Sequence, residues 1–384
     1  MNDAIPIPLS APDITDSEIE AVVSVLKGSR LSLGPALKEF ESAIAKYAGC
    51  AHAVAVNSGT SALHLALLAL GVGEGDEVIV PSFTFIAAAN VIRHVHATPV
   101  FVDIEPRTLN LDPVRVEAAI TPRTRAIMVV HTFGIPADMD ALSRLAQKNN
   151  LRIIEDACEA IGAEFRGTKV GTIGDAGAFA FYPNKQITTG EGGVLVTNNP
   201  ELAATARALR NQGRRETDDW FQHSELGYNY RISEINCALG VEQLKRIDAI
   251  LARREQVAES YRSRLADRTD LILSPSTLPD SRISWFVYVV RLSAEYPQTS
   301  RDFVTRQLAA AGIATGRYFA PIHLQPSYRK FAHASANLTV TEAEAPRCIA
   351  LPFFNRIAES QIDRVCVALI AILDGLKTGL YAKL

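Results

Sequence analysis

The feature that most constrains the fold is a series of short, almost continuously apolar segments that alternate with longer amphipathic ones from residue 52 onward. Strands of this kind are covered on both faces, whereas half-buried strands alternate apolar and polar residues. Their alternation with helical segments is typical of βαβ units. The sequence therefore predicts an α/β fold with a mainly parallel sheet sandwiched by helices. The predicted strands are 52–56, 77–80, 99–102, 126–130, 152–155, 179–182 and 194–197, with helices at 61–70 and 139–148.

The pattern changes after residue 233. Residues 233–266 read as one long helix or two joined helices, with Leu244, Ile247 and Leu251 on one face and many charged residues opposite. A smaller α+β part follows. Its predicted elements are a strand at 285–291, a helix near 301–312, an amphipathic helix at about 360–373 and a loose tail at 375–384.

These two textures predict two domains. We expect a large domain at 1–245 and a small C-terminal domain at 246–384. Although the N-terminal segment is counted with the large domain, it can pack on the small domain.

Bulk composition excludes several classes of partner. The chain has 384 residues, of which 48% are hydrophobic, and a net charge of −3, so electrostatics does not favour nucleic acid or anionic membranes. No apolar run reaches the roughly 20 residues of a membrane helix, and the N-terminus lacks a signal-peptide pattern. The five cysteines are scattered without metal-type spacing, which favours reduced thiols and no metal site. We expect a cytoplasmic protein.

Lys185 lies where an apolar, aromatic strand pattern ends and a glycine-rich turn begins, in Ala178-Phe-Ala-Phe-Tyr-Pro-Asn-Lys185. Burial at the lip of a sheet disfavours the ammonium form, so the free amine becomes available as a nucleophile. Such an amine forms Schiff bases with carbonyl compounds, including pyridoxal 5′-phosphate (PLP). For a single lysine, a solvated position in a hairpin turn is the commoner alternative.

Three other segments supply what a PLP lysine requires. In Asn57-Ser-Gly-Thr-Ser-Ala62, Gly59 lets the backbone approach an anion, and the amides of Thr60 and Ser61 with the Thr60 hydroxyl lie at a helix N-terminus. Asp156 falls at the carboxyl end of an apolar strand, where it can keep a pyridine nitrogen protonated. The alternatives are an ordinary N-cap at the first site and a helix-capping aspartate at the second.

The residues around Asp156 and the aromatic candidate complete this set. Glu155 points to the opposite side of the strand and is assigned a structural role, whereas Glu159 follows one helical turn later and can reach the ring oxygen O3′. Phe85 can stack on the pyridine ring. Phe83 competes with it, because a period of two residues places both on one side, and two core phenylalanines are the alternative to both.

Together these segments resemble the DegT/DnrJ/EryC1/StrS group of sugar aminotransferases, within the aspartate-aminotransferase-like type I fold of PLP enzymes. The resemblance covers nearly the whole chain. It rests on Leu31-Ser-Leu-Gly-Pro35, Phe40-Glu41, Ser58-Gly-Thr-Ser-Ala-Leu63, Pro81-Ser-Phe-Thr-Phe85, Glu155-Asp-Ala157, the Lys185 block, Leu226-Gly-Tyr-Asn-Tyr-Arg231, Gln243-Leu244 and Leu351-Pro352.

The resemblance implies a role for each candidate. Lys185 would hold the cofactor and shuttle protons, Asp156 would pair with the pyridine nitrogen, Glu159 would lie near O3′ and Phe85 would stack. Thr60 and Ser61 would hold the phosphate. Asn229 would reach the phosphate of a neighbouring subunit, which implies a homodimer with shared active sites. Arg231 would bind substrate or brace its loop; an interface salt bridge is the alternative.

One departure from the family concerns the phosphate site. The family commonly has serine five residues before the lysine, where this chain has Ala180, so one hydrogen bond worth about 1.5–3 kcal/mol is missing or supplied elsewhere. Some relatives carry histidine in place of the lysine and dehydrate sugars. Lys185 argues against that chemistry.

The resemblance implies an aminotransferase that moves an amino group from glutamate, through pyridoxamine 5′-phosphate, to a nucleotide-linked keto-sugar. Glu159 resembles perosamine-synthase-like members, which favours a GDP- or UDP-linked 4-keto-6-deoxy sugar, with dTDP sugars and a 3-keto sugar left open. A sugar dehydratase and a non-catalytic ligand-binding regulator are the competing functions. Lipopolysaccharide O-antigen, glycoprotein sugar and antibiotic sugar are all open as pathways. Candidates for binding the diphosphate are Arg214, Arg215, Arg231, His323 and Lys27.

Overall fold

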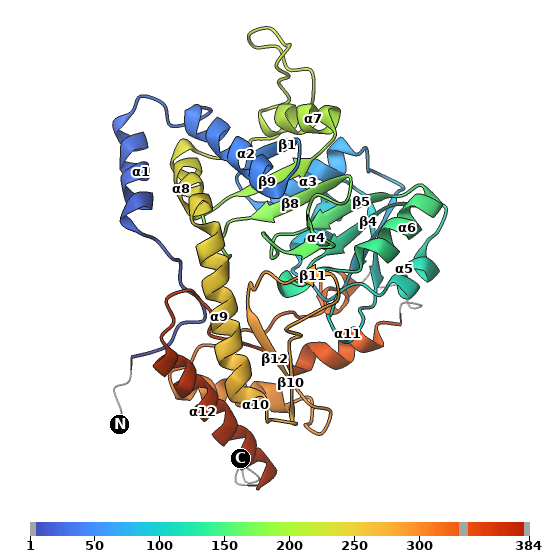
Figure 1. Ribbon diagram of the computed structural model, residues 1–384. Helices are drawn as coiled ribbons and strands as arrows, with labels where there is room; N and C mark the ends of the chain where they lie inside the picture. The colour runs from blue at the N-terminus through green and yellow to red at the C-terminus, as the bar shows by residue number, and fades with distance from the viewer. Residues whose placement is uncertain (1–4, 330–336, 380–384) are drawn as a thin grey trace.

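The computed structural model describes residues 5–329 and 337–379. Figure 1 shows a central sheet with helices packed on both sides and a second group of strands and helices around the long helix α9 (Ile247–Leu265). The seven strands of the central sheet have the order β1-β9-β8-β5-β4-β2-β3. β9 runs antiparallel to both of its neighbours, and the other adjacent pairs are parallel. The predicted α/β fold with a mainly parallel sheet is confirmed.

The strands of the central sheet are short and end close to the predicted positions. They are β1 (His52–Val56), β2 (Glu77–Pro81), β3 (Thr98–Val102), β4 (Thr124–Val130), β5 (Arg152–Asp156), β8 (Ala176–Ala180) and β9 (Gly193–Thr197). The helices of the first part of the chain are α1 (Asp16–Lys27), α2 (Pro35–Ala48), α3 (Gly59–Ala69), α4 (Ala87–His94), α5 (Pro113–Ala119), α6 (Met139–Asn149), α7 (Pro200–Arg210) and α8 (Glu234–Lys245).

Both faces of the central sheet are buried, which explains the continuous apolar strands. Along β4, Ala126 and Met128 pack in the cluster formed with α3, α4 and α7, while Ile127 and Val129 pack in the cluster formed with α5 and α6. α2 and α8 cover the second face near β1 and β9. The period of two is therefore present, but it separates two apolar layers instead of an apolar and a polar one.

The long helical segment is two helices, α8 and α9, which meet at Arg246. The C-terminal part holds a three-stranded antiparallel sheet, β10 (Leu271–Leu273), β12 (Tyr288–Leu292) and β13 (Cys348–Leu351). Three further helices accompany it: α10 (Ser300–Ala310), α11 (Thr339–Glu344) and α12 (Glu359–Lys377). No helix within residues 5–329 and 337–379 has the length and apolar character that a membrane crossing requires.

Backbone pairing at the following two places is among the contacts that join the parts of the chain. Ile7 lies in the apolar cluster of the C-terminal part and exchanges backbone hydrogen bonds with Gly312 and Ala314. A small sheet contains β11 (Ser281–Arg282), β6 (Glu164–Phe165) and β7 (Thr168–Lys169) in this order, so β11 of the C-terminal part pairs with β6 of the first part. The domain division at residues 245 and 246 stays a prediction; it falls where α8 gives way to α9.

Three predicted boundaries are wrong. The strand expected at 179–182 ends at Ala180, because the chain turns toward Lys185, whose amide donates to the Tyr182 carbonyl at 2.9 Å. The strand expected at 285–291 begins only at Tyr288; residues 285–287 are apolar because they are buried without pairing. Helix α12 continues to Lys377, so the tail is not loose from residue 375, and residues 380–384 lie outside the described part.

Glu155 has the structural role expected of it. Its side chain is buried and accepts hydrogen bonds from the amides of Gly171, Ile173 and Gly174 at 2.6–2.7 Å. His131 Nδ1 accepts from the Ala137 amide, so Nε2 carries the ring proton and donates to Glu155 at 3.0 Å. One carboxylate therefore ties β5 to the loop that leads into β8.

We predict that Glu155→Gln lowers the free energy of unfolding by about 3 kcal/mol, because an amide group leaves buried donors without an acceptor. Urea unfolding measures the change. Glu117→Gln is the matched control: Glu117 forms an exposed ion pair with Lys148 at 2.9 Å, and its loss should cost at most about 1 kcal/mol. Equal losses in the two variants would contradict the assignment.

Candidate active site

A cavity of about 450 Å³ lies at the carboxyl ends of β2, β5 and β8. This edge of a parallel sheet is where α/β proteins place ligands. The cavity gathers most of the predicted site residues, which come from segments far apart in the sequence. Its lining includes Ser58, Gly59, Thr60, Thr84, Phe85, Asp156, Cys158, Glu159, Ala180, Tyr182, Asn184, Lys185, Glu191, Phe286, Tyr318 and Phe319.

Lys185 points its amine into this cavity, and its side chain is only 13% exposed, so it is not a solvated turn lysine. Nζ lies 3.6 Å from Glu159 Oε1 and 4.0 Å from the centroid of the Phe286 ring. Burial raises the pKa of the Glu159 carboxyl, an effect that the nearby lysine and the Phe133 amide oppose. The amide donates to Glu159 Oε2 at 3.0 Å.

Asp156 lies at the end of β5, buried, with its side chain in the lining of the cavity. No helix follows it, because residues 157–163 form successive turns, so the helix-cap alternative is wrong for Asp156. Oδ1 accepts from the Cys158 amide at 3.2 Å. Glu159 likewise lies on a turn rather than one helical turn later, and this turn brings it within reach of Lys185.

The turn before α3 has the geometry of an anion site. Ser58 is the N-cap, and its hydroxyl accepts from the Ser61 amide at 3.1 Å. Ser61 is buried and donates from its own hydroxyl to Asn57 Oδ1, so it braces the turn and is not among the lining residues. The amides of Gly59 and Thr60 belong to the first helical turn, whose N–H groups have no partner within the helix.

Close packing requires glycine in this turn. A Cβ on Gly59 would lie 2.7 Å from Ala180 Cβ and 2.8 Å from Cys158 Sγ. A Cβ on Gly193, in β9, would lie 2.4 Å from the Ser58 carbonyl oxygen. The anion turn therefore rests directly on β8 and β9.

The two phenylalanines after β2 separate. The chain bends at residues 82–84 instead of continuing as a strand, so the period of two no longer applies. Phe83 is fully buried and packs edge-on against Phe133 and Phe319. Phe85 is 60% exposed and lines the cavity. Of the two, Phe85 has the position that a stacking group requires.

Three predicted residues lie outside the lining of the cavity. Asn229 is exposed, and Arg231 donates to Asn211 Oδ1 at 3.1 Å. Both ring nitrogens of His323 have partners, Ser82 Oγ at 2.6 Å and Glu342 Oε1 at 3.2 Å. Their assigned roles stay predictions.

The remaining candidates for the diphosphate lie outside the lining as well. Arg214 stacks on the Trp220 ring at 4.8 Å. Arg215 pairs with Glu201 and Glu225, and Lys27 is exposed on α1. Their roles also stay predictions.

The part of the lining that comes from the C-terminal third of the chain was not predicted from the sequence. Phe286, Tyr318 and Phe319 face the cavity, yet no local motif surrounds them. Tyr182 and Asn184 were also missed, although their positions beside Lys185 were a usable signal.

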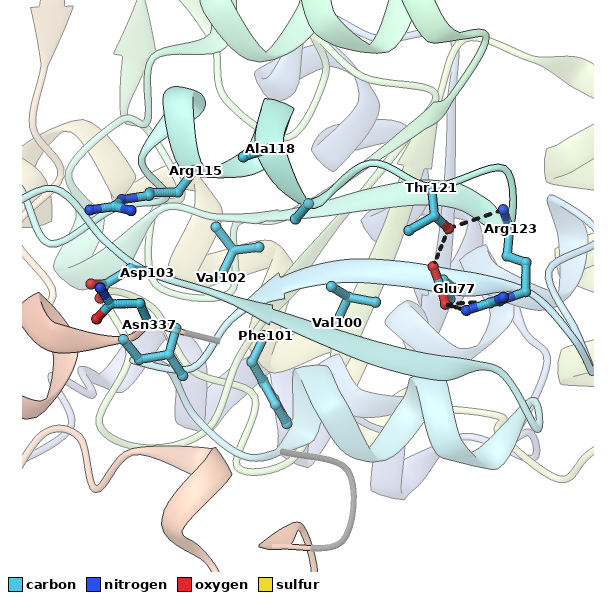
Figure 2. A pocket seen from close by; sticks show the side chains of 12 residues that line it. Glu77, Val100, Phe101, Val102, Asp103, Arg115, Ala118, Thr121, Arg123 and Asn337 are labelled. Carbon is cyan, nitrogen blue, oxygen red and sulfur yellow. Dashed lines mark hydrogen bonds and ion pairs between the residues drawn. The ribbon is translucent and has the colours of Figure 1, made fainter. Parts of the chain in front are cut away.

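A second cavity, of about 470 Å³, lies at the edge of the sheet beside β3 and α5 (Figure 2). Its two buried carboxylates already have partners, whereas Arg115 is exposed. Glu77 accepts from the Thr121 hydroxyl at 2.5 Å and from Arg123 Nε at 2.9 Å, and Asp103 accepts from the amides of Val340 and Thr341. Figure 2 shows apolar side chains of Val100 and Val102 between these groups. Among the described residues that line this second cavity there is no lysine to match the buried amine of the first.

Comparison with known proteins gives the same picture over the whole chain. A model of the DegT/DnrJ/EryC1/StrS aminotransferase family matches residues 12–370. The chain is 44% identical over 376 residues to the GDP-perosamine synthase of Caulobacter vibrioides, covering 97% of this chain and all of that protein. It is 38% identical over 380 residues to the spore coat polysaccharide biosynthesis protein SpsC of Bacillus subtilis, covering 96% and 97%.

Solved structures agree. DesV of S. venezuelae, in complex with a ketimine intermediate, matches with a TM-score of 0.88 and 39% identity, covering 95% of this chain and 98% of that one. The putative sugar aminotransferase Spr1654 of Streptococcus pneumoniae, in its pyridoxamine phosphate form, matches with a TM-score of 0.94 and 30% identity, covering 98% and 100%. A PLP form of Spr1654 is also known.

The residues present fit PLP. The cavity offers a buried amine for the aldehyde, a buried carboxylate for the pyridine nitrogen and a helix N-terminus for the phosphate. Ala180 and Cys158 already fill the position that a Cβ on Gly59 would take, so glycine lets this turn pack directly on β8 with Gly59 and Thr60 in the lining of the cavity. Ala180 lines the cavity beside this turn, and Ser58 and Thr60 supply hydroxyl groups in the same lining.

We predict that Gly59→Ala weakens PLP binding about 5- to 150-fold, because the added methyl group collides with Ala180 and Cys158 at a cost of about 1–3 kcal/mol. A spectroscopic titration of the apoprotein with PLP measures the affinity. Gly73→Ala is the control, since its Cβ would meet nothing closer than 3.9 Å. Unchanged affinity in Gly59→Ala would contradict the assignment of the anion turn.

Proposed function

Since the chain belongs to the DegT/DnrJ/EryC1/StrS aminotransferase family, whose structures are known in PLP and pyridoxamine phosphate forms, we propose that it is a PLP-dependent transaminase acting on a nucleotide-linked keto-sugar. Glutamate is the proposed amino donor. One observation carries the proposal: Lys185, Asp156, Gly59 and Thr60 lie in one cavity, in a chain 44% identical to a GDP-perosamine synthase.

The proposed division of labour follows from the geometry. Lys185 binds the aldehyde, Asp156 pairs with the pyridine nitrogen, and the amides of Gly59 and Thr60 with the Thr60 hydroxyl bind the phosphate. Phe85 covers the ring, and Glu159 lies beside Lys185 within reach of O3′. When bound, PLP supplies an electron sink for the bond that breaks at the substrate carbon.

Lys185 is the proposed acid and base. In each half of the reaction, Nζ takes a proton as general base from one carbon next to the reacting nitrogen and delivers it as general acid to the carbon on the other side of that nitrogen. Two features of this chain support that role: the amine is held in a largely buried cavity, which excludes most water, and Glu159 can balance the charge of the ammonium at 3.6 Å. Asp156 lies in the lining of the same cavity.

For the acceptor we propose the C4 keto group of a 6-deoxy sugar linked to GDP. The relative from Caulobacter vibrioides, named a GDP-perosamine synthase, supports this assignment. The relative from Bacillus subtilis is named for spore coat polysaccharide biosynthesis, which supports an amino sugar destined for a surface polysaccharide such as lipopolysaccharide O-antigen. The enzyme is proposed to work in the cytoplasm.

We further propose a homodimer with shared active sites. Asn229 does not line the cavity of its own chain, and its side chain is exposed. Its neighbour Tyr230 is tied to the anion turn, because the Asn57 amide donates to the Tyr230 carbonyl at 2.9 Å. Asn229 therefore lies near the active site of its own chain without lining it. This is the position expected of a residue that contributes to the active site of a second copy of the chain.

We predict that glutamate bleaches the visible band of the PLP-loaded protein and that GDP-4-keto-6-deoxymannose restores it, with an amino sugar as product. Absorbance and NMR of the product are the measurements. A panel of GDP-, UDP- and dTDP-linked 3- and 4-keto sugars identifies the acceptor. Absence of bleaching would rule out glutamate transamination; a deoxygenated product without a new amine would identify a dehydratase.

We predict that Lys185→Ala lowers turnover at least about 10³-fold, because both proton transfers lose their acid and base. Steady-state kinetics with glutamate and the keto-sugar measures the loss. Lys148→Ala, which removes an amine that is 68% exposed, should keep wild-type turnover. Near-normal activity of Lys185→Ala would refute its role.

A further inference from the structure

The Lys185 amine has a second neighbour besides Glu159. The face of the Phe286 ring lies over Nζ, 4.0 Å from the ring centroid to the nitrogen. Phe286 is buried and precedes β12, so it reaches the cavity from the C-terminal part of the chain. The two neighbours are of opposite chemical kind, one a carboxylate and the other an aromatic face.

The Phe286 ring is held firmly in this position. Arg254, buried on α9, donates from Nη2 to the Phe286 carbonyl at 2.8 Å and from Nε to the Trp285 carbonyl at 2.6 Å. Its Nη1 donates to Asn355 Oδ1 at 3.0 Å, which anchors the guanidinium itself. The Phe286 side chain is held as well, because its ring stacks on the Tyr318 ring with an angle of 14° between the two planes.

The two neighbours of the amine are also tied to each other. Gln186, which follows Lys185 in the chain, donates from Nε2 to the Glu159 carbonyl at 2.7 Å and to the Ser284 carbonyl at 3.1 Å. The Ser284 amide in turn donates to Gly134 at 3.0 Å, and a Cβ on Gly134 would lie 1.7 Å from the Ser284 oxygen. The backbone that precedes Phe286 is therefore packed against Gly134 and tied through Gln186 to the backbone of Glu159.

An aromatic face discriminates between the two protonation states of an amine. The ring quadrupole attracts an ammonium ion and gives little to a neutral amine, and the attraction grows when the pair is shielded from water. For a buried pair the effect corresponds to about a tenfold change in proton affinity. Other titratable groups that line the same cavity are Asp156, Cys158, Glu159, Tyr182, Glu191 and Tyr318.

We propose that Phe286 is a positioning residue that, with Glu159, holds Lys185 Nζ as the ammonium ion while it carries the substrate proton. The inference rests on the proposed function. In that function Nζ takes the proton from the substrate carbon and then delivers it to the carbon on the other side of the reacting nitrogen. The ring stabilises the acid form of the shuttle without itself exchanging a proton. The C-terminal part of the chain thereby contributes to the chemistry as well as to the shape of the cavity.

The test measures the rate at which full-length apoprotein captures PLP between pH 6 and pH 10, since only the neutral amine attacks the aldehyde. In Phe286→Leu the midpoint of this pH dependence should fall by about one unit, a tenfold loss of proton affinity. Phe286→Tyr keeps an aromatic face and should keep the wild-type midpoint. Phe319→Leu removes another aromatic ring of the cavity, one that stacks on Phe133, and should also leave the midpoint unchanged.

Two further measurements make each outcome decisive. Pyridoxamine phosphate cannot link to lysine, so its binding reports whether a variant keeps an intact site. Pentafluorophenylalanine at position 286 retains the shape of the ring but weakens its negative face, and should lower the midpoint as Phe286→Leu does. An unchanged or higher midpoint in these two proteins would overturn the inference alone. Failure of the wild-type apoprotein to capture PLP would overturn the proposed function as well.

Discussion

Burial of one amine beside a carboxylate is the constraint on which the rest of this structure depends. Lys185 is withdrawn from water with Glu159 3.6 Å from its nitrogen and the centroid of the Phe286 ring 4.0 Å from it. An isolated buried ammonium would lose its proton or the cavity would admit water. The carboxylate faces the same problem, and burial raises its pKa while the lysine lowers it. Each group thus lowers the free-energy cost of burying the other, and the protonation of both depends on what binds between them.

The sheet makes this arrangement possible because parallel strands end at a common edge. β2, β5 and β8 deliver Thr84, Asp156 and Ala180 to that edge, although long stretches of sequence separate them. Glycine allows the turn before α3 to lie close to the sheet, since Gly59 packs against Ala180 of β8 and Gly193 of β9 packs against Ser58. Glu155 secures the same strand from its other side through three backbone amides. Adjacent residues of β5 therefore divide the work, one stabilising the fold and the other facing the cavity.

The proposed chemistry uses both halves of the chain. The first half provides the groups that would bind the cofactor, and the C-terminal part closes the cavity with Phe286, Tyr318 and Phe319. Gln186 links them, because its side-chain amide donates to the Glu159 carbonyl and to the Ser284 carbonyl. Closure by aromatic rings excludes water and strengthens electrostatic interactions inside the cavity. A site assembled in this way can tune one lysine from several directions at once.

The sequence by itself determined the layered α/β fold, because apolar strands without alternation can exist only between two layers of helices. It also determined Lys185, Asp156 and the Gly59 turn as candidates, since each lies at a junction between a strand and the segment that follows. It could not determine that residues 82–84 bend, which sends Phe83 into the core and leaves Phe85 at the cavity, nor that Asp156 precedes turns instead of a helix. Only the tertiary structure placed the Phe286 ring over the Lys185 amine and gave both ring nitrogens of His323 a hydrogen-bond partner. Contacts of this kind join distant segments, and they leave no periodic or local signal in the sequence.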